Sequence, residues 1–130
     1  MGSVNEAACE FIRTFDGPRL DDAMIDRVLE RMSSDASYQV YGWDQPVVGH
    51  AALRTEFQKQ GPMFSDTETE IHTVASVGRT VFVQRTDHIT MFGKRGGIDV
   101  VGVFQLDTAG KVTSWRDYLD SAQIAATFAP

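Results

Sequence analysis

The chain has 130 residues, the length of one ordinary domain, and 42% of them are hydrophobic while 23% are charged, which is typical of a folded domain rather than a disordered chain. Twelve Lys and Arg residues stand against 18 Asp and Glu residues, and the resulting net charge of −6 argues against a nucleic-acid or anionic-membrane partner. The single cysteine excludes an internal disulfide and a cysteine-based metal cluster. We therefore expect one domain spanning residues 1–130.

The N-terminal segment, Met1 to Glu6, lacks the basic and apolar regions of a secretory signal. No apolar run approaches the roughly 20 residues of a membrane span. These two features predict a cytoplasmic protein with no membrane partner.

The first third of the chain has the apolar spacing of helices. Residues 4–15 and 20–32 each carry one apolar stripe, and the intervening Asp16-Gly17-Pro18 separates the two helices. A short strand is expected at residues 37–41, and a third helix at residues 50–60.

The second half is rich in Val, Ile, Thr and aromatic residues, with short turns between segments. Strands are expected at residues 67–77, 80–92, 97–107 and 111–119, and the last three form a C-terminal antiparallel meander. A final helix at residues 121–128 begins after Asp120, a good capping residue. The pattern predicts an α+β fold, with N-terminal helices packed on a curved mixed or antiparallel sheet that encloses a ligand cavity.

Three ionisable residues interrupt strand faces that are otherwise apolar. Arg85 and Asp87 share a face with Val81, and Asp117 lies between Trp115 and Leu119 on the face of the last strand. A buried face that carries charges predicts a site rather than a simple core.

The expected turns line these residues up. A four-residue loop at 93–96 sets Asp87 opposite Gly102, and a two-residue turn at 109–110 sets Gly102 opposite Asp117. The two carboxylates then lie about 10 Å apart at their backbones, with the missing side chain of Gly102 leaving space between them.

Arg85 neutralises only one of two buried carboxylates, so the other is expected to stay protonated near neutral pH. The set then holds one general base, one general acid and an arginine that positions both. The alternative is a buried Asp–Arg–Asp network that only stabilises the fold.

Three segments together resemble the limonene-1,2-epoxide hydrolase family, within the wider NTF2-like and SnoaL-like superfamily. They are Val83-Gln84-Arg85-Thr86-Asp87, residues 102–106, and residues 110–120 with Trp115-Arg116-Asp117-Tyr118. The resemblance implies a cone-shaped barrel with a deep apolar pocket, a homodimer, and no metal or organic cofactor.

By position in the family, Asp87 is implied as the acid that protonates the epoxide oxygen and Asp117 as the base that activates water, with Arg85 bridging them. Tyr38 matches the family's water-holding tyrosine. The family's asparagine two residues later is replaced by Val40, and the only asparagine of the chain is Asn5. This departure leaves three alternatives.

The first alternative is a hydrolase with another water-holding group, such as Gln39 or Tyr41. The second is an enzyme whose nucleophile is a hydroxyl of the substrate, and the third is a relative with different acid–base chemistry. One-step attack on an epoxide needs a base and an acid together, because the developing alkoxide leaves poorly without a proton. The retained Asp87, Arg85 and Asp117 favour hydrolysis.

We therefore predict a cofactor-independent epoxide hydrolase that opens a small apolar epoxide to a vicinal diol. The competing predictions are an isomerase or cyclase of the SnoaL-like or ketosteroid-isomerase-like kind, and a non-catalytic small-molecule-binding module. Loop residues Trp43, Met63 and Phe64 are expected beside the pocket mouth. A dimer contact is expected on the outer sheet face, at Phe82, Phe92, Val101 and Val103. The residues expected to bind substrate are Val40, Val83, Ile89, Val100, Gly102, Phe104, Trp115 and Leu119.

Overall fold

The structure is a computed structural model that describes residues 3–130. Met1 and Gly2, the start of the segment inspected for a secretory signal, lie outside the described residues. Within that range the elements are α1 (Val4–Arg13), α2 (Asp22–Glu30), β1 (Met32–Val40), β2 (Val47–Val48), α3 (His50–Gln60), the 3-10 turn η1 (Gly61–Met63), β3 (Ser65–Val77), β4 (Thr80–Met91), β5 (Lys94–Leu106), β6 (Val112–Leu119) and α4 (Ser121–Thr127).

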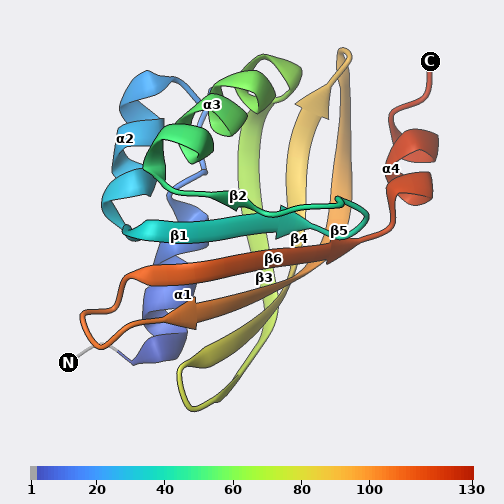
Figure 1. The fold of residues 1–130 in the computed structure, drawn as a ribbon. Helices are drawn as coiled ribbons and strands as arrows, with labels where there is room; N and C mark the ends of the chain where they lie inside the picture. Colours follow the sequence, from blue (N-terminus) through green and yellow to red (C-terminus); the bar gives the residue numbers. More distant parts are fainter. Residues whose placement is uncertain (1–2) are drawn as a thin grey trace.

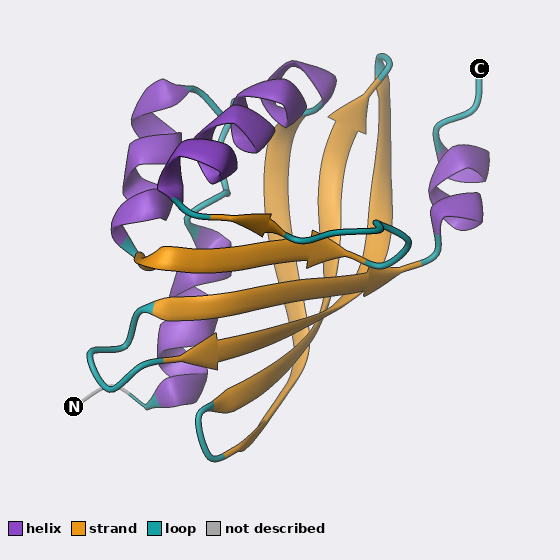
Figure 2. Ribbon diagram, viewed as in Figure 1, coloured by secondary structure: helices purple, strands orange, loops and turns teal. Residues whose placement is uncertain are grey.

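Six strands form one mixed sheet in the order β2-β1-β6-β5-β4-β3. Strands β1 and β6 run parallel and the other neighbours are antiparallel. Figure 1 shows that β3, β4 and β5 bend along their length, so the sheet curls without closing. In Figure 2, α2 and α3 lie together on one side, while α4 stands apart beside the other end of the sheet. The predicted α+β, cone-like architecture is confirmed.

Side-chain caps precede helices α1, α2 and α4. Ser3 accepts a hydrogen bond from the backbone N–H of Glu6, and Asp21 accepts one from that of Met24. Asp120 caps α4 as predicted, accepting from the backbone of Ala122. The apolar faces of α1 and α2 pack into the core, and no helix among residues 3–130 is long and apolar enough to cross a membrane.

Strand β1 begins five residues earlier than predicted. The segment Ser33-Ser34-Asp35 resembles a turn in the sequence, but it continues the strand from Met32 to Ala36. Parallel pairing with β6 decides this conformation, since Met32 lies opposite Val112 and Tyr38 opposite Trp115. This pairing is long-range, and local composition does not reveal it.

The predicted register between β4 and β5 is wrong by four residues. The strands are joined at Phe92 and Gly93, which have φ values of 53° and 74°, a two-residue turn with positive φ at both positions. Asp87 therefore pairs with Ile98, and Gly102 pairs with Val83.

A four-residue shift is even, so every side chain stays on its predicted face. The other predicted pairing, Gly102 opposite Asp117, is confirmed. The charged residues of β4 and β6 therefore share one face of the sheet.

Candidate active site

A cavity of about 430 Å³ lies between the curled sheet and the helices, a volume within the usual range of small-molecule sites. Arg85 and Asp87 reach its wall from β4, Asp117 from β6, and Tyr38 from β1. The four side chains predicted to be catalytic therefore come together on one wall from three strands.

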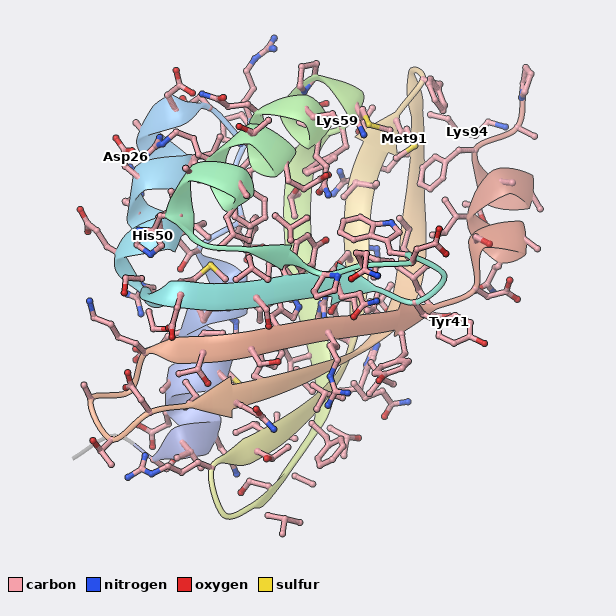
Figure 3. The ribbon with its side chains drawn as sticks, viewed as in Figure 1. Asp26, Tyr41, His50, Lys59, Met91 and Lys94 are labelled. Carbon is pink, nitrogen blue, oxygen red and sulfur yellow. The ribbon has the colours of Figure 1, made fainter. Side chains whose placement is uncertain are left out.

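Figure 3 labels two of the residues that line the cavity. Lys59, near the end of α3, and Met91, at the end of β4, lie on the same side of the molecule, and both line the cavity. Five of the eight residues predicted to bind substrate also line it: Val40, Ile89, Val100, Trp115 and Leu119. Apolar side chains thus surround the charged group.

Arg85 bridges the two carboxylates. Its Nε donates to Asp87 Oδ1 at 2.9 Å and its Nη2 to Asp87 Oδ2 at 3.3 Å. Its Nη1 donates to Asp117 Oδ1 at 3.1 Å and its Nη2 to Asp117 Oδ2 at 2.8 Å. The planar fork of the guanidinium matches both carboxylates, and the arginine side chain is 1% exposed.

The guanidinium crosses the sheet over Gly102. A Cβ at this position would lie 2.6 Å from Arg85 Nη1 and 3.0 Å from Asp117 Oδ1, too close for any real side chain. Only glycine leaves room for the bridge from β4 to β6. The space expected at Gly102 therefore holds the arginine head group and is not part of the cavity wall.

Asp117 receives a third hydrogen bond from its own strand. Trp115 Nε1 donates to Asp117 Oδ1 at 2.8 Å. The indole ring stacks on the Tyr38 ring with a centroid distance of 4.2 Å, and this places the tyrosine beside the carboxylate. The parallel pairing of β1 with β6 produces this contact, since Tyr38 lies opposite Trp115.

The two carboxylates differ in exposure: the side chain of Asp87 is 23% exposed and that of Asp117 is 7% exposed. Burial raises the pKa of Asp87, with Asp117 adding to the increase, while Arg85 acts against it. A raised pKa keeps a proton on Asp87 to a higher pH than on an ordinary aspartate.

The two neighbouring groups keep their usual protonation states. Burial lowers the pKa of Arg85, but Asp117 and Asp87 more than offset this, so the guanidinium stays charged. Burial, followed by the Asp117 charge, raises the pKa of Tyr38, so its hydroxyl remains a hydrogen-bond donor.

Three residues predicted to bind substrate lie outside the cavity wall. Val83 and Phe104 are fully buried in the core, where Phe104 packs against Phe11 of α1 at a centroid distance of 5.8 Å. They share the sheet face of Arg85, Asp87 and Asp117, but α1 covers that part of the sheet. Gly102, the third, lies beneath the Arg85 guanidinium.

Trp43, Met63 and Phe64 were predicted beside the mouth of the cavity. In the structure, all three line the cavity. Sequence analysis missed the polar residues of the wall: Glu56, Lys59, Gln60, Thr67 and Thr69. Glu56 and Gln60 share the face of α3 that buries Leu53 and Phe57, and two polar residues within an apolar stripe are the signal that was available.

A cavity with this wall is suited to acid–base chemistry on a small apolar molecule. Asp87 has a raised pKa, Asp117 accepts hydrogen bonds from two side chains, and Arg85 fixes the distance between the two carboxyl groups. Among residues 3–130, no group of three or more His, Cys, Asp or Glu side chains is arranged to hold a metal ion.

We compared the sequence of this chain with models of known protein families. The sequence model described as "Limonene-1,2-epoxide hydrolase catalytic domain" matches residues 8–129. The chain belongs to the limonene-1,2-epoxide hydrolase family. The match covers β1, β4 and β6, the strands that carry the carboxylate–arginine–carboxylate wall.

One curated relative is "Epoxide hydrolase EphG" of Mycobacterium tuberculosis, which is 30% identical to this chain over 101 residues. The match covers 78% of this chain and 66% of the relative, so the chain spans just under two thirds of that protein's length.

Two solved structures resemble the fold. One is described as an M. tuberculosis LEH-like epoxide hydrolase, with a TM-score of 0.75 and 25% identity over 95% of this chain and 87% of the other. The second is an NTF2-like protein of unknown function from Burkholderia pseudomallei, with a TM-score of 0.80 and 15% identity over the full length of both chains. The second likeness establishes an NTF2-like fold for this member of the family.

Proposed function

We propose that the protein hydrolyses a small, apolar epoxide to a vicinal diol in one step, with Asp87 as general acid and Asp117 as general base. The observation that carries the proposal is the Arg85 bridge, which holds the two carboxyl groups on the wall of one apolar cavity. The family match supports the reaction class.

The proposed step balances without a cofactor. Asp117 takes a proton from water as the water oxygen bonds to an epoxide carbon, and the carbon–oxygen bond of the ring breaks. The departing oxygen takes the proton of Asp87. Before the reaction Asp87 is protonated and Asp117 is ionised, and after it Asp87 is ionised and Asp117 is protonated. The Arg85 charge balances one ionised carboxylate in both states, so the total charge of the three side chains is unchanged. Proton exchange with solvent then restores the starting state.

The substrate class follows from the wall of the cavity. Ile89, Val100, Leu119 and the ring of Trp115 surround the charged group, and about 430 Å³ suits a small molecule. We assign substrate contact to these residues and to Val40. The homodimer and the cytoplasmic location expected from the sequence stay predictions.

The test is turnover of a panel of small epoxides in oxygen-18 water, analysed by mass spectrometry. The expected result is a diol with one labelled oxygen, formed by the wild type and lost in Asp117→Asn and Asp87→Asn. Asp99→Asn is the matched control, because Asp99 is an exposed aspartate that bonds Thr86 Oγ1 away from the cavity. A wild type that forms no diol from any epoxide would refute the proposal and favour an isomerase, a cyclase or a binding module.

A further inference from the structure

The site lacks one group that water attack needs. Val40 is the pairing partner of Asp117 across β1 and β6 and lines the cavity, so the family's asparagine position lies beside the base but holds an apolar side chain. A water without fixed hydrogen bonds adopts many orientations, and a water held by hydrogen bonds in the reactive orientation attacks faster.

Neither of the two nearby candidates from the sequence fills this gap. Gln39 is not among the residues that line the cavity, and its Nε2 already donates to the backbone carbonyl of Trp43 at 2.9 Å. Tyr41 is 70% exposed, and Figure 3 shows its ring pointing outward beside the end of β6. The missing hydrogen-bonding group must come from another element.

Helix α3 supplies an amide. Gln60, its last residue, is the only Asn or Gln among the residues that line the cavity in the described part of the chain. The helix is fixed over the site by Phe57, whose ring packs on the Tyr38 ring at a centroid distance of 5.7 Å. Burial raises the pKa of Tyr38, and donation from the amide N–H of Gln60 acts in the opposite direction, which supports a position for this amide near the tyrosine ring end.

Glu56 fixes the orientation of this amide. Gln60 Nε2 donates to Glu56 Oε2 at 2.8 Å, one helical turn away. The amide nitrogen of Gln60 therefore faces Glu56. The carbonyl oxygen of Gln60 has no hydrogen bond from another side chain in the described part of the chain and is available as an acceptor.

We propose that Gln60, oriented by Glu56, holds the attacking water together with Tyr38 and Asp117. The assignment rests on the proposed hydrolysis. A water has two hydrogens to donate and two lone pairs. One hydrogen goes to Asp117 and the other to the Gln60 carbonyl, and one lone pair accepts from the Tyr38 hydroxyl. The remaining lone pair forms the bond to the epoxide carbon, and the proton shared with Asp117 is the one transferred.

The test compares Gln60→Ala with Gln58→Ala, a matched substitution on the same helix. Gln58 is exposed and bonds Asp22 outside the cavity. Gln60→Ala is expected to lower kcat about tenfold, the effect of losing one hydrogen bond, with KM within about twofold of wild type. Gln58→Ala is expected to keep both constants.

Rescue provides a readout that a purely structural role would not give. Adding Val40→Asn to Gln60→Ala returns an amide to the place beside Asp117 and is expected to restore most of the lost kcat. The proposal is overturned if the double variant has the unfolding temperature of the wild type but a kcat no higher than that of Gln60→Ala.

The remaining outcomes separate the two proposals. If the wild type forms labelled diol and Gln60→Ala does so at full kcat, the assignment of Gln60 is wrong while hydrolysis stands. An increase in KM alone, for substrates with a polar group, makes Gln60 a substrate contact and likewise overturns the assignment. If the wild type forms no diol, the proposed function fails and the water site fails with it.

Discussion

Replacing Gly102 with alanine tests the Arg85 bridge most directly. The new Cβ would lie 2.6 Å from Arg85 Nη1 and 2.7 Å from a ring carbon of Phe104. An unstrained contact needs about 3.5 Å, so the guanidinium must move by roughly 0.9 Å. Nη1 is 3.1 Å from Asp117 Oδ1, so a displacement of this size is expected to distort this hydrogen bond.

Two effects of different size are expected from this change. Overpacking at a fully packed position costs about 1–3 kcal/mol of the free energy of unfolding. A misplacement of nearly 1 Å in a catalytic group lowers the rate about 100-fold. The activity should therefore fall far more than the stability of the protein.

The assay is steady-state diol formation together with thermal unfolding for Gly102→Ala and for Gln105→Ala, an exposed position on the same strand. Gln105→Ala is expected to match the wild type in both measurements. A Gly102→Ala variant with wild-type kcat would show that the glycine is not needed for the bridge, and the reasoning would fail.

Four further predictions follow from the same contacts. Arg85→Met removes the positive charge that balances the buried Asp117 carboxylate, so it is expected to lose about 3–5 kcal/mol of stability at neutral pH and less at acid pH, where that carboxylate is protonated; unfolding measured across pH checks this. Trp115→Phe keeps the ring stack but loses the 2.8 Å bond to Asp117, and kcat is expected to fall about tenfold in turnover assays. Because the pKa of Asp87 is raised in the folded protein, the folded state binds its proton more tightly than the unfolded state does. Wild-type stability should then fall as pH rises above the ordinary aspartate value of about 3.9, an effect absent in Asp87→Asn, and turnover should be lost once Asp87 ionises. Val101→Glu places a charge on the exposed outer face of β5 and is expected to convert a wild-type dimer to a monomer in sedimentation; a wild-type monomer contradicts the predicted interface.

The sequence predicted correctly the elements that depend on local residue patterns. The helix at 50–60 and the Asp120 cap were predicted as observed, because apolar periodicity and capping depend on neighbouring residues. The first half of β1 was missed, since its conformation depends on a parallel partner about 80 residues later in the chain. The β4–β5 turn was misplaced because Phe92 adopts a positive φ that a phenylalanine seldom takes.

The candidate site was predicted through alternation and not through register. Strand alternation placed Arg85, Asp87 and Asp117 on one face, and an even register error left that face unchanged. Strand alternation could not predict which inward-facing residues line the cavity and which are covered by a helix. Phe104 and Trp115 both alternate inward, but α1 covers Phe104, while Trp115 faces the cavity as well as the core. Gln60 was missed because only tertiary packing brings α3 over Tyr38.

The placement of the two tryptophans gives the cavity an optical signal of its own. The chain contains only two tryptophans, Trp43 and Trp115, and both line the cavity. Emission excited at the red edge of tryptophan absorption therefore originates entirely at the cavity wall. A molecule that enters the cavity contacts its wall and alters the surroundings of both rings, including the Trp115 indole beside Asp117. Ligand occupancy can thus be followed without a label, including for compounds that bind and are never converted.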